Sequence, residues 1–223
     1  MEASELRTIV LARHGQTNFN LNERIQDPIN PYLTETGHLQ AKNLGKEIEK
    51  LGLNFDIIIC SDTTRNKETL ANIYPNYEKM ANIKVDPRLQ ERYHGDLIGK
   101  TKQDVEKEIG QKFTDRLSWE LYFEGTNKSR LTEKNYIHDE SLDSIKKRVT
   151  SLIFELRDKN KILLIGSAII NHYILELLQY GTIGVNKPQF PKGKDIHFQD
   201  NNELRIISLD GDMKMKEYSS IKY

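Results

Sequence analysis

Four ionisable side chains in this sequence together offer one kind of chemistry: Arg13, His14, Arg65 and Glu91. A neutral imidazole is able to attack a phosphoryl group and hold it as a phosphohistidine until water cleaves the intermediate. Arginine suits the phosphate, because its planar fork matches the phosphate oxygens and stays charged. A carboxylic acid then protonates the departing oxygen. These residue types are therefore the ones that metal-independent phosphoryl transfer needs, where positioning and charge stabilisation do most of the work.

Polar clusters follow three short apolar runs, which we predict to be buried strands. The runs, with the clusters after them, are 7–12 with Arg13-His14-Gly15, 56–60 with Ser61 to Arg65, and 161–165 with Gly166-Ser167. Glu91 comes just after a shorter candidate strand at 83–85. Because ligands of open α/β sheets bind beyond the carboxyl ends of the strands, chain topology alone would gather these clusters at one edge.

Helical patterns alternate with these strands, and most of them begin at a good capping residue. The expected helices run from Thr34 to about Leu51, from Ser61 or Asp62 to about Ile73, from the capping box Thr101 to Asp104 onward, from Ser141 to about Leu156, and from the end of the 161–165 strand to about Leu178. Asp210-Gly211-Asp212, between 204–209 and 213–218, indicates a hairpin. We therefore expect an α/β fold, a three-layer α/β/α sandwich with a mostly parallel central sheet and this hairpin at one edge.

One stretch, residues 116–139, shows no clean period and contains Trp119, Tyr122 and Phe123. We interpret it as an excursion from the sheet that forms a lid, whose aromatic residues either line a leaving-group pocket or pack the excursion itself. Residues 181–199 are expected to form a loop. The length suits a single domain over 1–223.

The bulk composition excludes some classes of partner. Lys+Arg and Asp+Glu both number 33, so the formal net charge is zero and nothing favours nucleic acid or an anionic membrane as partner. No segment reaches the roughly 18–20 apolar residues that span a bilayer, and residues 1–6 lack the apolar stretch of a signal peptide. The single cysteine, Cys60, ends an apolar run and is interpreted as a buried structural thiol. We expect a soluble, cytoplasmic protein.

The run Leu11 to Asn20 (LARHGQTNFN) resembles the signature of the histidine phosphatase superfamily, in its phosphoglycerate mutase-like branch. Further segments resemble later motifs of the family in the same order: 33–41 (LTETGHLQA), 61–65 (SDTTR), 89–99 (LQERYHGDLIG), and Glu140-Ser141 with Arg148. Asp62 stands where the family usually has proline. A lone Arg-His-Gly is a weak signal, but this ordered set covers most of the chain and is strong.

The resemblance implies roles for individual residues. His14 would be the nucleophile, Arg13 and Arg65 would bind the phosphate, and Glu91 would be the proton donor. The residues expected to bind substrate around them are Gln16, Thr17, Asn20, Ser167 and Ala168. Gly15 would let the backbone approach the anion closely. The resemblance implies no metal and no cofactor, and a small phosphorylated metabolite or a phosphoprotein as substrate.

The last motif departs from the family pattern of a strand, a small residue, a histidine and a glycine. Here the strand leads to Gly166-Ser167-Ala168, so that Ser167 occupies the histidine position. A serine donates one hydrogen bond but carries no charge, and losing such a donor typically costs about 10²–10³ in rate. Helix geometry turns His172 away from position 167. His94, which shares a loop with Glu91, is the more plausible substitute.

Simpler interpretations exist for some of these side chains. Taken alone, Arg65 would be a solvated helix arginine, and Glu91 would pair with Arg92 or a nearby lysine on the surface. Within the ordered motifs, both are better explained by the site. Lys146-Lys147-Arg148 is expected to form a solvated helix face.

Three functions remain open at this stage. The leading one is a phosphatase that hydrolyses a phosphate monoester through a phosphohistidine at His14. Ser167 motivates the second, a degenerate member that binds a phosphorylated ligand or partner without turnover. The third, a phosphoglycerate mutase, is less favoured, because Gly99-Lys100-Thr101 leads directly into a helix as in the phosphatase branch. The patterns favour no particular substrate and no oligomeric state.

Overall fold

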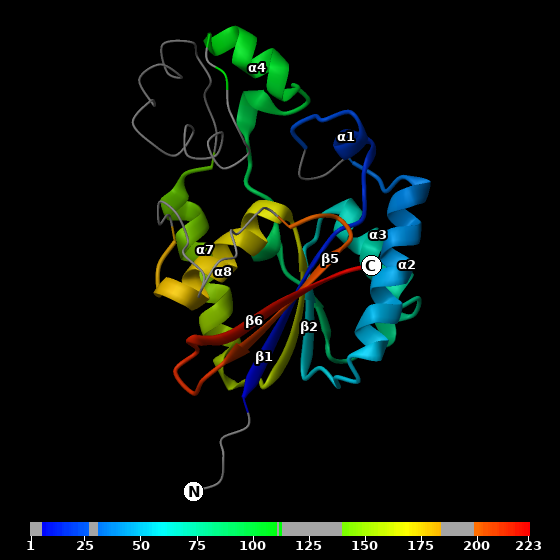
Figure 1. The fold of residues 1–223 in the computed structure, drawn as a ribbon, viewed down its shortest axis with the longest axis vertical. Coiled ribbons are helices and arrows are strands. Elements are labelled where there is room, and N and C mark those ends of the chain that lie inside the picture. The colour runs from blue at the N-terminus through cyan, green and yellow to red at the C-terminus, as the bar shows by residue number, and fades with distance from the viewer. Residues whose placement is uncertain (1–5, 27–30, 111, 113–139, 184–198) are drawn as a thin grey trace, which may run out of the picture.

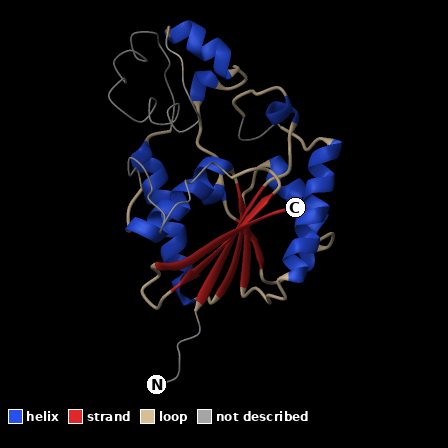
Figure 2. Cartoon of the chain, viewed as in Figure 1, coloured by secondary structure: helices blue, strands red, loops and turns tan. Residues whose placement is uncertain are grey.

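The computed structural model describes residues 6–26, 31–110, 112, 140–183 and 199–223. Its described strands form one six-stranded sheet in the order β3-β2-β4-β1-β5-β6. They are β1 (Arg7–Arg13), β2 (Ile57–Cys60), β3 (Ile83–Val85), β4 (Lys161–Gly166), β5 (Glu203–Leu209) and β6 (Met215–Lys222). Helices lie on both sides of this sheet (Figure 2).

The sheet is mostly parallel. Strand β4 pairs in parallel with β1 and β2, and β2 pairs in parallel with β3. Strands β5 and β6 add antiparallel pairs at the other edge. In the β1–β4 ladder, Arg13 stands opposite Gly166, so the two central strands end in step. The predicted parallel sheet with an antiparallel hairpin at its edge is confirmed.

The described helices form two outer layers. They are α1 (Asn18–Leu21), α2 (Glu35–Lys50), α3 (Thr64–Ile73), α4 (Lys102–Ile109), α7 (Leu142–Glu155) and α8 (Ala168–Tyr180), with short 3-10 turns η1 (Tyr77–Lys79), η2 (Pro87–Leu89), η3 (Gly95–Leu97) and η4 (Leu156–Asp158). Figure 1 shows α2 and α3 on one side of the sheet and α7 and α8 on the other, with α1 and α4 beyond its carboxyl edge.

Strand periodicity builds a core on each face, because successive side chains point to opposite sides of the sheet. Ile9 and Leu11 of β1 belong to the cluster under α7 and α8. Val10 and Ala12 belong to the cluster under α2 and α3. Together the two cores make the predicted three-layer sandwich. Cys60 is fully buried in the second core, and burial raises the pKa of its thiol, which confirms the prediction of a structural cysteine.

Most predicted helix starts agree with the structure. Thr34, Thr101 and Ser141 each accept a backbone N–H as N-cap residues. The cap of α3 is Thr63, so the prediction of Ser61 or Asp62 is wrong. Both residues have tertiary partners instead: the Ser61 N–H donates to Ile165 O, and the Asp62 carboxylate accepts from Gln90 Nε2 at 2.7 Å.

Strand β6 begins at Met215 and not at residue 213 as predicted. The Asp210 carboxylate accepts hydrogen bonds from the backbone N–H groups of Asp212 and Lys214, both at 3.0 Å. Met213 adopts a positive φ of 61° inside this turn, so the chain cannot pair there as a strand.

Several predictions fall on other parts of the chain. The predicted lid at 116–139, with its aromatic residues, and most of the loop at 181–199 lie outside the described residues. The single-domain interpretation stays a prediction. Among the described helices, none combines the length and the apolar composition that a membrane crossing requires.

Candidate active site

The centre of the candidate site is the point where β1 and β4 end side by side. One residue beyond the last pair, the His14 N–H still donates to Gly166 O at 3.1 Å. This bond places His14 opposite Ser167 in neighbouring parallel strands, which run roughly 4.8 Å apart. Ser167 is also the N-cap of α8. The two predicted residues from opposite ends of the chain are therefore brought together.

The His14 ring is buried, with 1% of its surface exposed. Its Nδ1 lies 2.8 Å from Gly15 O. Because a carbonyl oxygen only accepts, Nδ1 must carry the hydrogen, and the neutral ring then keeps its lone pair on Nε2. This tautomer is the one that a nucleophilic imidazole needs.

Gly15 serves a purpose that the sequence did not reveal. A Cβ at Gly15 would lie 2.3 Å from Gly37 O, and a Cβ at Gly37 would lie 2.1 Å from Gln16 O. The two glycines let the chain after His14 cross the start of α2 at close range. The Gly15 N–H donates to Thr69 Oγ1 at 3.1 Å. The close approach of this backbone to an anion stays a prediction.

Arg65 lies in the first turn of α3 and is completely buried. Thr69 ties that turn to the His14 segment, because its hydroxyl accepts from Gly15 N and donates to Arg65 O at 2.8 Å. A guanidinium with no exposed surface is not a solvated helix arginine, so that simpler interpretation is wrong. The buried charge calls for anionic or polar groups around it.

Arg13 is 7% exposed, and its Nη1 donates to Gln199 O at 2.6 Å. The Gln199 side chain is itself fully buried. Its Nε2 donates to Leu11 O and Glu203 O, both at 2.8 Å, and its Oε1 accepts from Asn171 Nδ2 at 2.6 Å. Gln199 thus joins β1, β5 and α8 behind Arg13. Sequence reasoning missed this residue, because no local pattern marks it.

Glu91 is 8% exposed and lies near the N-terminus of α8. Its Oε1 accepts from the Arg92 N–H at 3.0 Å, and its Oε2 accepts from the Ile169 N–H at 3.4 Å. Ile169 follows Ser167 by two residues, so the carboxyl group reaches the same strand end as His14. Burial contradicts the alternative of a surface ion pair for Glu91.

Ser167 is fully buried, and so is Ala168 after it. Although Ser167 is the N-cap of α8, its hydroxyl makes no capping bond. The Ser167 Oγ instead accepts from Asn66 Nδ2 at 3.5 Å, and the same amide nitrogen donates to Thr63 Oγ1 at 2.7 Å. Ser167 therefore connects the end of β4 to α3, next to Arg65.

Gln16, Thr17 and Asn20 follow His14 along the chain, and hydrogen bonds to other protein groups hold their side chains. Thr17 and Asn20 form the capping box of α1, and the Gln16 Oε1 accepts from the Thr34 hydroxyl at 2.9 Å. These bonds shape the segment that leaves the site. Their contact with substrate stays a prediction.

Two other buried histidines, His172 and His94, lie in elements next to the site. His172 is buried in α8, with its Nε2 3.6 Å from Glu176 Oε1 one helical turn further on. His94 is 5% exposed and precedes η3, in the loop that carries Glu91. A role for His94 in the site stays a prediction.

The comparison with known sequences decides the family. The sequence pattern of the histidine phosphatase superfamily (branch 1) matches residues 9–213. The chain belongs to this superfamily. A 2,3-bisphosphoglycerate-dependent phosphoglycerate mutase of Bartonella henselae is 39% identical over 108 residues, which cover 48% of this chain and 52% of that protein. The chain thus spans about half the length of the curated relatives that it matches.

Solved structures of two phosphatases share the fold. An alpha-ribazole phosphatase from Shigella flexneri has a TM-score of 0.67 at 17% identity and covers 93% of both chains. A mycobacterial glucosyl-3-phosphoglycerate phosphatase has a TM-score of 0.68 at 20% identity and covers 98% of both chains. The likeness confirms the phosphoglycerate mutase-like α/β fold of this superfamily member.

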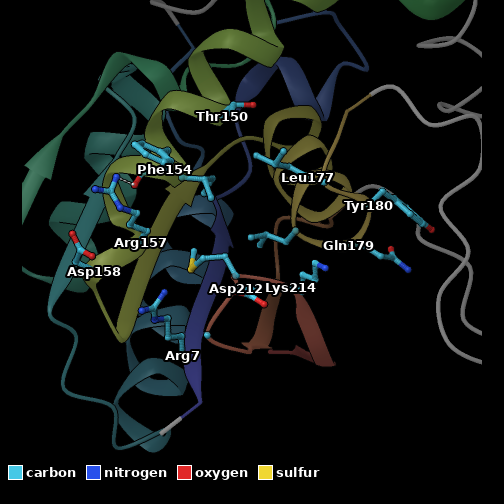
Figure 3. A pocket seen from close by; sticks show the side chains of 15 residues that line it. Arg7, Thr150, Phe154, Arg157, Asp158, Leu177, Gln179, Tyr180, Asp212 and Lys214 are labelled. Carbon is cyan, nitrogen blue, oxygen red and sulfur yellow. Dashed lines mark hydrogen bonds between the residues drawn. The ribbon is translucent and has the colours of Figure 1, made fainter. Parts of the chain in front are cut away.

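This superfamily member also has a cavity of about 770 Å³ at the far end of β1 (Figure 3). It lies between the C-terminal ends of α7 and α8 and the β5–β6 turn. Arg7, Arg157 and Lys214 line it together with Asp158 and Asp212. None of the predicted site residues lines this cavity.

Within the described ranges, no three or more His, Cys, Asp or Glu side chains gather as a metal site would require.

Proposed function

We propose that this protein is a metal-independent phosphatase that hydrolyses a phosphate monoester through a phosphohistidine at His14. The observation that carries the proposal is the His14 ring, whose Nδ1–H donates to Gly15 O at 2.8 Å and which therefore has its lone pair on Nε2, the atom that would attack phosphorus. Arg65 is buried in the first turn of α3, which Thr69 ties to Gly15, and Glu91 is buried against the start of α8, two residues after Ser167. The substrate is a small phosphorylated metabolite or a phosphoprotein.

The reaction runs in two displacements. The Nε2 of His14 attacks phosphorus while the bond from phosphorus to the leaving oxygen breaks, and Glu91 gives that oxygen its proton. Arg13 and Arg65 hold the phosphoryl oxygens and balance their charge. Water then attacks the phosphohistidine, Glu91 takes up the water proton, and inorganic phosphate leaves with His14 regenerated.

Ser167 stands in our proposal where the superfamily's second catalytic histidine would be. Its hydroxyl accepts from Asn66 Nδ2 and so keeps its own hydrogen for donation to a phosphoryl oxygen. A neutral hydroxyl stabilises the transition state less than a charged donor does. We therefore expect turnover about 10²–10³ slower than a complete site would give. A site slowed further would act as a binding module for phosphorylated ligands.

The curated relatives favour a second candidate, phosphoryl transfer in a phosphoglycerate mutase. The same phosphohistidine serves both reactions, which differ in whether water or a second hydroxyl accepts the phosphoryl group. Hydrolysis is the better supported, because helix α4 begins at Lys102, shortly after Gly99, and leaves a short connection after the Glu91 loop. Isomerisation of a phosphoglycerate, with bisphosphoglycerate as primer, separates the two.

The deciding experiment is steady-state hydrolysis of a chromogenic phosphate ester by the wild type and by His14→Ala. The proposal predicts turnover that the variant lacks. Equal rates for the two proteins would contradict it. Thermal stabilisation by inorganic phosphate without any product would instead support the binding function.

A further inference from the structure

Glu140-Ser141 and Arg148 resemble a motif of the superfamily, but the resemblance implies no role for them. Arg148 was expected on a solvated helix face, and the structure contradicts this, because its side chain is only 16% exposed. The Arg148 Nε and Nη2 donate to Glu140 Oε1 and Oε2 at 2.8 and 2.9 Å. This two-pronged pair fixes the plane of the guanidinium. Its remaining nitrogen is therefore aimed in one direction.

That nitrogen reaches the loop that carries Glu91. The Arg148 Nη1 donates to Arg88 O at 2.6 Å and to Gln90 O at 2.8 Å. On the other side of Glu91, the Glu140 N–H donates to Tyr93 O at 2.7 Å. The backbone is thus fixed both before and after the proposed acid.

The hydrogen bonds of the Glu91 carboxyl group itself are weaker. The bond from the Ile169 N–H is 3.4 Å long, and the other donor is the neighbouring Arg92 N–H at 3.0 Å. The place of this carboxyl group therefore depends on where its backbone is held. The strong bonds that hold the backbone come from Arg148 and Glu140.

We propose that Arg148, oriented by Glu140, is a positioning residue that aims the Glu91 carboxyl group at the leaving oxygen. The inference rests on the proposed function. Misplacing a catalytic group by about 1 Å costs on the order of 10²-fold in rate. The rate lost when Glu91 is misplaced must depend on the leaving group. An alkoxide is a poor leaving group and needs a proton from the acid, whereas a nitrophenolate is a good leaving group and does not. A general loss of structure would slow both alike.

The test compares an alkyl phosphate with 2,4-dinitrophenyl phosphate for the wild type, Arg148→Gln and Glu140→Gln. The matched control is Arg88→Gln. Arg88 also joins this segment to α7, through Glu155 at 2.6 Å and Ser151 at 3.1 Å, but its described bonds reach no carbonyl beside Glu91. We expect Arg148→Gln to lower kcat on the alkyl ester about 10²-fold and to change the dinitrophenyl rate little.

Arg88→Gln should keep the ratio of the two rates. Equal losses on both esters for Arg148→Gln, or the same change of ratio for Arg88→Gln, would overturn the positioning role. If the wild type hydrolyses neither ester, the proposed function fails, and amide hydrogen exchange then tests the inference separately. Faster exchange at Arg92 and Ile169 in Arg148→Gln but not in Arg88→Gln would support it, and unchanged exchange would overturn it.

Discussion

His14 and Ser167 face each other across the β1–β4 ladder, one residue beyond the last pair, Arg13 and Gly166. The His14 N–H donates to Gly166 O at 3.1 Å, so this register continues to the end of both strands. An imidazole and a hydroxyl thus share the proposed phosphoryl site. Because position 167 lies opposite His14, substitutions there test directly what a second donor contributes to the reaction.

Ser167→His should raise the rate of ester hydrolysis by about 10²–10³, because it adds a charged donor beside the transferring phosphoryl group. Position 167 is fully buried, so the larger ring is expected to cost about 1–3 kcal/mol of stability. Turnover and the thermal midpoint should be measured together, with Ser167→Ala as the control. A folded Ser167→His that still binds vanadate but gains no rate would show that the serine does not limit the reaction.

Gln199→Ala should weaken substrate binding more than it slows turnover, because the Gln199 side chain fixes the backbone carbonyl that holds Arg13. It would also strip buried partners from Leu11 O, Glu203 O and Asn171, at about 1–3 kcal/mol for each group left unpaired. KM, kcat and the urea midpoint are the measurements. The exposed Gln103→Ala in α4 is the matched control. An unchanged midpoint for Gln199→Ala would refute this account of the network.

Gly37→Ala should destabilise the protein, because the new Cβ would lie 2.1 Å from Gln16 O, a backbone atom that cannot move alone. A loss of about 1–3 kcal/mol is expected, together with reduced activity, since the segment after His14 must shift. Gly45→Ala lies in the same helix, and the nearest contact of its Cβ is ordinary, 3.4 Å from Ile73 Cα. Chemical denaturation should find that Gly45→Ala hardly changes stability. Equal losses of stability for the two variants would contradict a close approach of the chain after His14 to Gly37.

Stability should fall in mild acid through Glu140. Burial works against ionisation, but hydrogen bonds from Arg148 and Ser144 and the charge of Arg148 hold the pKa of this carboxyl below its usual 4.5. A group whose pKa is lower in the folded state stabilises the fold above its unfolded pKa. That contribution is lost as the pH falls through the folded value, here from about pH 5 downward.

The free energy of unfolding, measured in urea from about pH 7 to pH 3, should therefore decline less for Glu140→Gln than for the wild type. Glu49→Gln, at an exposed position of α2, is the control. The same pH slope in Glu140→Gln as in the wild type would mean that Glu140 does not contribute.

Local patterns predicted the elements whose signals are themselves local. The β1 run and the caps at Thr34 and Thr101 depend on neighbouring residues only, and their predictions were correct. Ser61 failed as a predicted cap, because its N–H still pairs with Ile165 O of β4, so the chain leaves the sheet only afterwards and the helix is capped at Thr63. Tertiary contacts decide such cases, and one sequence does not display them.

Some residues of the candidate site were likewise predicted from sequence motifs, and others became visible only in the structure. Arg13, His14, Arg65 and Glu91 were predicted from ordered motifs, and the structure buries all four. Arg13 and His14 lie at the end of β1, Arg65 lies in the first turn of α3, and Glu91 lies in the loop after η2. Gln199 stayed hidden because its bonds join residues far apart in the chain, 186 positions apart for Arg13. The run of charges from Lys146 to Arg148 predicted a solvated helix face, because such a run does not show that Arg148 binds backbone carbonyls of another segment.

Trapping the covalent intermediate tests the central claim most directly. The protein is mixed with a ³²P-labelled phosphate ester, quenched in alkali within one turnover, and digested for peptide mapping. The account predicts a phosphoryl label that is stable to alkali and labile to acid, located on His14 and absent from His14→Ala. Turnover without any label on His14, or a label on another residue, would contradict it.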